Sequence, residues 1–209
     1  MKSTLFTLFC FAAGFANAAG PKPNIVLFVV DDMGWQDTSV PFWGEPTPLN
    51  KKFHMPSMER LAADGIKFTQ AYATAVCSPT RVSMMTGYNA ARHRVTNWTL
   101  FQNVSNDANP PRLQPLKLNN HGLQPKPGVS NSVAAKWLPE YLRQAGYHTI
   151  HVGEAHLGAI GTPGDDPRNP GFDVNIAGHA AGFQRGQRSW RCPPCARRQS
   201  TCRSLPPRG

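Results

Sequence analysis

The stretch LPEYLRQAGYHTIHVGEAHLG, Leu138–Gly158, decides the fold class of this chain. A helix is expected from Pro139 to Ala145, because the residue before a proline avoids helical geometry and Gly146 is suited to end the helix. The segment YHTIHVG, Tyr147–Gly153, then predicts a core strand. A helix followed by a strand is typical of a mainly parallel sheet covered by helices. We therefore expect an α/β protein with a mainly parallel central sheet flanked by helices.

A second buried strand is expected over residues 24–30 of PNIVLFVVDDMGW, Pro23–Trp35. Its near-continuous apolar and β-branched run suits a strand that is buried on both faces. The run ends at Asp31 and Asp32, and ligands in open α/β sheets bind beyond the carboxyl ends of strands. Two adjacent carboxylates repel each other unless a cation or solvent separates them. Asp31 and Asp32 are therefore either a cation site or a solvated strand end.

A short helix and a further strand are expected next. Met58, Leu61 and Ala62 share one helical face, and Gly65 is suited to end that helix. Residues 66–73 alternate between apolar and polar side chains, which predicts a strand.

The stretch CSPTRVSMMTG, Cys77–Gly87, predicts a helix over residues 81–86. Pro79 suits the first turn of a helix, which places the helix N-terminus beside Cys77. The polar segment 89–132 has little periodicity, and we expect a long surface loop that helps to shape a substrate site.

The N-terminus has the three parts of a secretory signal. Lys2 precedes the apolar run Leu5–Phe15, and the small residues of Ala16–Ala18 complete a cleavage site. We expect a signal peptide over residues 1–18 and an exported protein, periplasmic or extracellular; the alternative is a buried N-terminal helix. No apolar run is long enough to span a bilayer, so no membrane anchor is expected.

The formal charge of +10 would suggest an acidic partner such as nucleic acid. Residues 184–209, however, hold seven Arg and no acidic residue, so the first 183 residues carry 15 basic against 12 acidic side chains. The last segment lacks a hydrophobic period and has the composition of a GC-rich gene translated in the wrong frame. We interpret residues 184–209 as a disordered or frameshifted tail and residues 19–183 as the native part. Because an exported chain meets little nucleic acid, no nucleic-acid partner is expected.

Cys77 is the one cysteine of residues 19–183, since Cys10 belongs to the expected signal peptide and Cys192, Cys195 and Cys202 to the tail. A leftover cysteine in an exported chain is reactive, modified or buried.

Three motifs and their order along the chain resemble the type I sulfatases of the alkaline phosphatase-like superfamily. In chain order they are NIVLFVVDDMGWQD at Asn24–Asp37, CSPTR at Cys77–Arg81 with MTGY behind it, and GYHTIHVGEAHLG at Gly146–Gly158. The resemblance covers residues 23–182 and implies the N-terminal portion of a sulfatase catalytic domain. Because members of that family are much longer, it also implies a partial, truncated fold that lacks later metal ligands and catalytic residues.

The resemblance implies a chemistry for these residues. In the family, the cysteine of C-x-P-[ST]-R, here Cys77, is oxidised to formylglycine by a formylglycine-generating enzyme, and the hydrated aldehyde attacks the sulfur of a sulfate ester. Arg81 and His156 match catalytic residues. Asp31 and Asp32, together with residue 77, match ligands of a Ca²⁺ ion. The implied substrate is a sulfated carbohydrate or another sulfate ester.

One position departs from the family pattern. The third motif usually has Lys where this chain has Glu154, and that Lys contacts the substrate sulfate. A carboxylate there would repel an anionic ester in a site of low effective dielectric. We expect Glu154 to impair sulfate binding and this chain to be inactive as written. The alternatives are a phosphate or phosphonate ester hydrolase of the same superfamily and a non-catalytic fragment.

Overall fold

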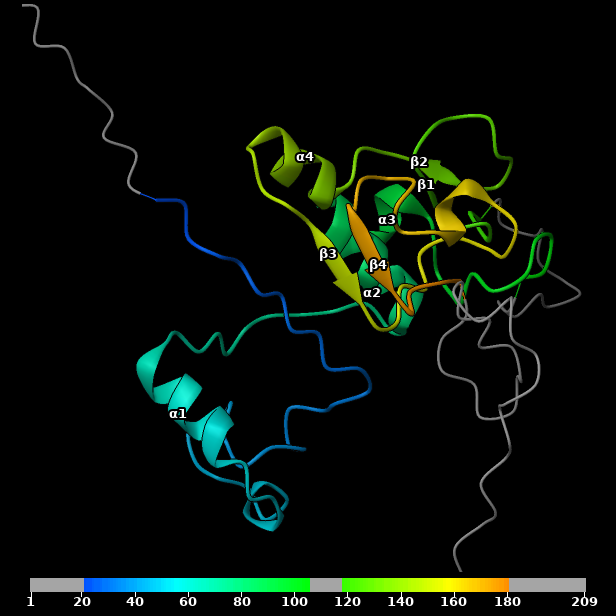
Figure 1. The fold of residues 1–209 in the computed structure, drawn as a ribbon. Coiled ribbons are helices and arrows are strands. Elements are labelled where there is room, and N and C mark those ends of the chain that lie inside the picture. The colour runs from blue at the N-terminus through cyan, green and yellow to red at the C-terminus, as the bar shows by residue number, and fades with distance from the viewer. Residues whose placement is uncertain (1–20, 106–117, 181–209) are drawn as a thin grey trace, which may run out of the picture. The chain divides into compact units, whose positions relative to one another are not determined.

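The computed structural model describes residues 21–105 and 118–180 (Figure 1). The expected signal peptide and the expected tail both lie outside the described residues. The chain divides into two compact units after Met33, and each unit is described by itself.

The first unit contains an extended segment that ends in a turn at Asp31 and Asp32. The strand expected over residues 24–30 is not formed in the described part of the chain, and the side chains expected to be buried are exposed, with Val26 86% and Phe28 84% accessible. A β-strand forms only when it makes hydrogen bonds to a neighbouring strand. The apolar pattern indicates a high β-propensity, but it does not determine whether such a neighbour is present.

The second unit carries the helices, and their ends follow from local sequence. Pro56 and Pro139 lie in the first turns of two of them, where the missing N–H of proline costs nothing. Gly87 ends a third helix in the left-handed conformation (φ 71°) and donates its N–H to the carbonyl of Ser83 at 2.8 Å. The bounds are η1 Asn50–Lys52, α1 Pro56–Asp64, α2 Cys77–Thr86, α3 Ala90–His93, α4 Leu138–Gln144 and η2 Pro163–Asp165.

Three of these helices confirm the sequence predictions. α1 ends at Asp64, directly before the expected Gly65. α4 begins and ends one residue earlier than the helix expected over residues 139–145. α2 begins at Cys77 itself, four residues before the expected start at residue 81. The cysteine is therefore part of the first helical turn instead of lying beside it.

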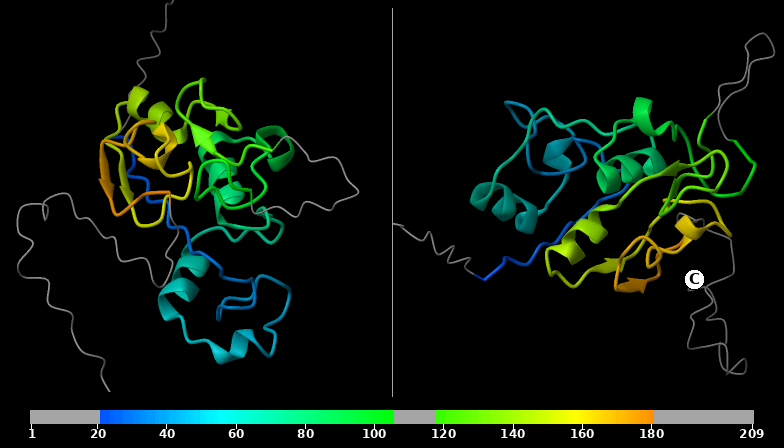
Figure 2. Two further views of the ribbon diagram at one scale, coloured as in Figure 1. Left: turned by 90° about the vertical axis from the view of Figure 1, so that its right-hand side faces the viewer. Right: turned by 90° about the horizontal axis from the view of Figure 1, so that it is seen from above.

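The described strands form two parallel pairs, as expected for a mainly parallel sheet. β1 Leu123–Gln124 pairs with β2 Val133–Ala134, and β3 Ile150–Val152 pairs with β4 Val174–Ile176. Ile150 lies opposite Val174 in the second pair, and the two strands run side by side in both further views (Figure 2).

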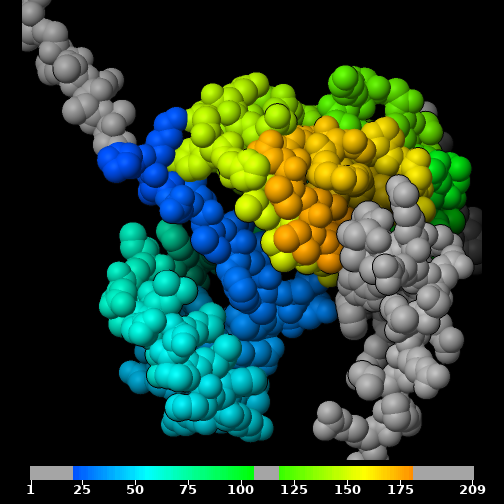
Figure 3. All heavy atoms as spheres, viewed as in Figure 1, coloured from blue at the N-terminus to red at the C-terminus, as the bar shows by residue number. Residues whose placement is uncertain are grey.

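Two further predictions about strands are wrong. β3 forms where expected, but Ile150 is 56% and Val152 68% exposed, so this pair is not a buried core (Figure 3). The strand expected over residues 66–73 does not form within the described residues, and Tyr72 is 91% exposed. Both segments have a sequence typical of a strand. The described structure, however, contains no neighbouring layer that buries their apolar side chains.

The hydrophobic core of the second unit is centred on α2. It joins helix, loop and strand residues whose side chains are fully or almost fully buried: Val82, Val95, Leu123, Trp137, Ala155 and Leu157. Two of these, Val95 and Leu123, come from the segment expected to be a surface loop. That expectation is therefore wrong for its described parts, which also contain α3 and β1.

Buried polar contacts also join α2 to the segment that follows it. Ser78 accepts a hydrogen bond from the backbone N–H of Thr99 at 3.3 Å, and both side chains are fully buried. Ser83 contacts Nε2 of His93 at 2.9 Å, while Nδ1 of His93 accepts the N–H of Val95 at 3.0 Å. Burial lowers the pKa of His93, so this histidine is neutral and structural.

Candidate active site

Cys77 lies at the first position of α2, directly after the extended residue Val76. The N–H groups of a first helical turn have no partner within the helix, and they place partial positive charge at this end. Ser78 and Pro79 are buried beside Cys77, which is itself half-buried and a free cysteine. The thiol therefore lies where the helix favours a negatively charged or polar group.

His156 meets Cys77 from the loop that follows β3. Its Nδ1 lies 3.1 Å from the Cys77 sulfur and 3.1 Å from a carboxylate oxygen of Glu154. The ring is buried, and its residue adopts the left-handed conformation (φ 47°) that few non-glycine residues adopt. The backbone N–H of His156 donates to the carbonyl of His179 at 3.0 Å, which helps to hold this conformation.

The contacts define the protonation of His156. An ionised carboxylate only accepts hydrogen bonds, so Nδ1 must carry a hydrogen, which the Cys77 sulfur shares. Burial alone would lower the pKa of His156, but the hydrogen bonds to Cys77 and Glu154 outweigh burial and raise the pKa to about 9. At neutral pH the ring is an imidazolium. Its Nε2 is buried and has no hydrogen-bond partner among the described residues.

Arg81 approaches the same carboxylate from one turn further along α2. Its Nη1 donates to the backbone carbonyl of Glu154 at 2.7 Å, and its Nε lies 3.6 Å from the Glu154 carboxylate. Both side chains are largely buried, with 11% of Arg81 and 18% of Glu154 exposed. Glu154 therefore contacts both cationic groups of the cluster, Arg81 and His156.

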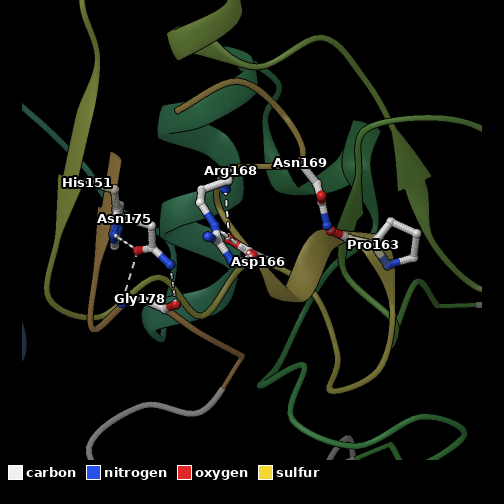
Figure 4. A network of polar contacts seen from close by, with 7 residues as sticks. All are labelled: His151, Pro163, Asp166, Arg168, Asn169, Asn175 and Gly178. Carbon is white, nitrogen blue, oxygen red and sulfur yellow. Dashed lines mark hydrogen bonds and ion pairs between the residues drawn. The ribbon is translucent and has the colours of Figure 1, made fainter. Parts of the chain in front are cut away.

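A polar network beside β3 supports the segment that reaches His156 (Figure 4). Asn175 contacts Nδ1 of His151 at 3.2 Å, donates to the carbonyl of Gly178 at 2.8 Å and accepts the N–H of Gly178 at 3.1 Å. Burial lowers the pKa of His151, and the nearby charge of Arg81 lowers it further. The turn held by Asn175 leads directly to His179, whose carbonyl accepts the N–H of His156.

Sequence reasoning missed this network. Asn175 follows no motif, and its one available signal is its position two residues after Asp173 in an apolar stretch that resembles a strand. Figure 4 also shows the neighbouring turn, where Arg168 and Asp166 form an ion pair. The hydrogen bond from Arg168 lowers the pKa of Asp166.

The structure thus brings together four of the six expected site residues. Cys77, Arg81, Glu154 and His156 form one cluster in the second unit. Asp31 and Asp32 belong to the first unit, are exposed, and lie in a turn where Asp32 has φ 53°. Their carboxylate oxygens are of the kind that Ca²⁺ prefers.

Comparisons with known proteins give the family context. A family model described as Sulfatase matches residues 23–201. An uncharacterized sulfatase of Schizosaccharomyces pombe is 32% identical over 160 residues, which cover 77% of this chain and 25% of that protein. N-acetylgalactosamine-6-sulfatase of Rattus norvegicus is 35% identical over 164 residues, which cover 78% of this chain and 26% of that protein. Arylsulfatase G of Canis lupus familiaris is 31% identical over 192 residues, covering 89% and 30%.

The chain spans about a quarter of the length of the first two of these relatives. None of the described helices has the length and apolarity needed to cross a membrane. The match to the family model extends over most of the chain and includes the Cys77 motif, the aspartate pair and the His156 loop. This protein belongs to the sulfatase family, in the alkaline phosphatase-like superfamily.

Proposed function

We propose that this chain supplies the nucleophile-bearing part of a sulfate ester hydrolase, in which Cys77 is converted to formylglycine. One observation carries the proposal: Cys77 at the start of α2 meets His156 from a segment 79 residues away. Arg81, one helical turn further along α2, reaches the same loop through the carbonyl of Glu154. Family membership supports the same reaction class.

The residues of the cluster have distinct proposed roles. A formylglycine at position 77 would supply a hydrated aldehyde. One of its hydroxyls would attack the sulfur while the S–O bond to the alcohol breaks and the alcohol leaves, and deprotonation of the second hydroxyl would then expel sulfate and restore the aldehyde. His156 lies close enough to the side chain of residue 77 to donate a hydrogen bond to an oxygen there. Arg81 and the N-terminus of α2 place positive charge where negative charge develops on the sulfate oxygens.

A calcium ion fits the donor chemistry of the first unit. Asp31 and Asp32 offer adjacent carboxylates, which repel each other in the absence of a cation. We propose that they bind Ca²⁺. The ion would supply positive charge that polarises the sulfate ester.

Glu154 acts against this chemistry. Its carboxylate contacts both His156 and Arg81, so it neutralises the two groups that would otherwise attract sulfate. It also adds a negative charge at the position where the family has a lysine. This observation favours a second candidate function, a sulfatase-derived chain that binds and hydrolyses sulfate esters poorly or not at all.

The remaining proposals concern context. We propose that residues 1–18 direct export to the periplasm or the extracellular space. A formylglycine-generating enzyme would be the maturation partner. A sulfated carbohydrate or another sulfate ester would be the substrate, in keeping with a relative named N-acetylgalactosamine-6-sulfatase.

Conversion of Cys77 tests the proposed function. The chain is produced together with a formylglycine-generating enzyme and labelled with an aldehyde-reactive hydroxylamine probe. It is then digested, and the mass of the peptide carrying residue 77 is measured by mass spectrometry. We expect labelling of the wild-type chain, none for Cys77→Ala, and reduced labelling for Pro79→Ala, while Ser83→Ala outside the motif serves as the control. A wild-type chain labelled no more than Cys77→Ala, in cells that label a reference sulfatase, would overturn the proposal.

A further inference from the structure

Three different metal-ligand types converge at the start of α2. The Cys77 sulfur, a Glu154 carboxylate oxygen and a ring nitrogen of His156 all lie within 4.8 Å of one another. The cysteine comes from the helix, and the other two come from the loop after β3. We propose that these three side chains bind a Zn²⁺ ion for as long as Cys77 remains an unmodified thiol.

The distances suit a single ion. Zinc binds cysteine sulfur, histidine nitrogen and carboxylate oxygen at about 2.0–2.3 Å, so neighbouring ligand atoms of a tetrahedral site lie roughly 3–4 Å apart. Nδ1 of His156 lies 3.1 Å from the Cys77 sulfur and 3.1 Å from the Glu154 oxygen. Both distances lie at the short end of that range, and the sulfur and the carboxylate oxygen lie within 4.8 Å of each other, so small side-chain movements would place all three atoms around one ion.

The ligand types select zinc over calcium. Calcium takes six to eight oxygen ligands, whereas this cluster offers one sulfur, one nitrogen and one carboxylate. Thiolate and imidazole together suit Zn²⁺. Three protein ligands leave the fourth tetrahedral position to a water molecule. The proposed ion is therefore distinct from the Ca²⁺ assigned to Asp31 and Asp32.

Binding must release protons. Zinc coordinates the thiolate of Cys77, so the thiol proton passes to solvent, and Nδ1 of His156 likewise gives up its proton to present a lone pair. Glu154 binds as the carboxylate and releases none. Binding of one Zn²⁺ to the thiol and the imidazolium thus releases two protons, and no oxidant or reductant is required.

Arg81 has two opposing effects on such an ion. Its guanidinium is a like charge near the metal, which weakens binding. It also donates to the Glu154 carbonyl at 2.7 Å and so fixes the residue whose carboxylate is the third ligand. With the two anionic ligands Cys77 and Glu154, the group of ion, ligands and Arg81 carries one net positive charge.

The residue at position 154 determines whether the proposed zinc site has a third protein ligand. The lysine typical of the family would place a cation where the zinc ion is proposed and would leave two protein ligands. The glutamate of this chain instead completes a set of three. This inference concerns the unconverted thiol, so it does not rest on the proposed sulfatase function and can succeed or fail independently of it.

The test uses the full 209-residue chain, produced without a formylglycine-generating enzyme so that Cys77 stays a thiol. Cys10, Cys192, Cys195 and Cys202 are replaced by serine, because these thiols would also bind zinc. Zinc affinity is measured by competition with a chromophoric chelator. Co²⁺ is then bound in place of zinc, since a thiolate ligand gives a sulfur-to-cobalt charge-transfer band in the near ultraviolet.

Variants assign the ligands. We expect one equivalent of zinc to bind, Cys77→Ser to abolish the charge-transfer band, and Glu154→Gln to weaken binding by at least about tenfold. Glu140→Gln, a change on α4 away from the cluster, is the matched control and should bind as the parent does. The absence of stoichiometric binding, or equal affinity of Glu154→Gln and Glu140→Gln, would overturn the proposal.

A second measurement needs no substitution at the cluster. Zinc bound to the Cys77 sulfur must slow alkylation of that thiol, which is followed by the mass of the peptide carrying residue 77. We expect slower alkylation with Zn²⁺ than with Ca²⁺ at the same concentration. Equal rates with the two ions would contradict zinc coordination by Cys77 even if the Glu154 variants failed to fold.

Discussion

The imidazole of His156 contacts the thiol of Cys77 across 79 residues of sequence, with Nδ1 and Sγ 3.1 Å apart. The contact forms because α2 begins at Cys77 and because the buried residues Ala155 and Leu157 anchor the His156 loop in the core. The same loop brings a Glu154 carboxylate oxygen within 3.1 Å of the same ring nitrogen. The candidate site is thus built by core packing on both sides of His156.

The charge of His156 depends on Glu154. Replacing the carboxylate in Glu154→Gln removes an anionic acceptor, so the pKa of His156 should fall from its value of about 9 while burial continues to lower it. NMR titration of the His156 ring measures this pKa, with Glu140→Gln as the control. An unchanged pKa in Glu154→Gln would show that the carboxylate does not contact the ring.

Leu157 should be a major contributor to stability. Its side chain is 1% exposed and belongs to the core cluster around α2. Leu157→Ala removes buried methyl groups and leaves a cavity, which should lower the free energy of unfolding by about 2–5 kcal/mol. Urea unfolding followed by circular dichroism measures the change.

The control for this prediction is another leucine. Leu61 on α1 is 72% exposed, so Leu61→Ala should change the free energy of unfolding by no more than about 0.5 kcal/mol. Equal effects of the two substitutions would contradict the assigned core.

Asp173 should stabilise the pair β3–β4 in a pH-dependent way. It accepts the N–H of Thr149 at 2.8 Å and its hydroxyl at 3.0 Å, and it pairs with Arg143. The hydrogen bond from the Thr149 backbone, followed by the one from its side chain and the Arg143 charge, lowers the pKa of Asp173 below its usual 3.8. The stabilisation is therefore full above that usual value and is lost as the pH falls through the lowered pKa.

Urea midpoints at neutral and acidic pH test this dependence. Asp173→Asn should lower the midpoint at neutral pH, and its difference from wild type should shrink in acid. Asp64→Asn, at the exposed end of α1, is the matched control. A difference between Asp173→Asn and wild type that stays constant across the pH range would contradict the assigned hydrogen bonds.

The helices could be predicted from the sequence because their signals are local. Proline near the start and glycine after the end define α1 and α4 without reference to the rest of the chain. The strands could be predicted only in part. The sequence predicts core strands in both segments 24–30 and 147–153, yet only the second contains a strand with a parallel partner in the described structure, because pairing is a tertiary property.

The members of the candidate site could be identified from motifs, but their contacts could not. That Cys77 and His156 belong to one site follows from the resemblance to sulfatases. That Glu154 binds Arg81 through both its carbonyl and its carboxylate depends on the left-handed backbone at His156 and on the network around Asn175. No local pattern in the sequence encodes these features.

We propose that Glu154 acts against sulfate ester hydrolysis, and a full-length relative that carries the family lysine tests this role most directly. The lysine is changed to Glu in one variant and to Gln in a control, and kcat/KM is measured with an aryl sulfate. Loss of the positive charge should slow both variants, and the added carboxylate should make the Glu variant at least about tenfold slower than the Gln variant. A Glu variant with near-normal kcat/KM, or one equal to the Gln variant, would contradict the claim.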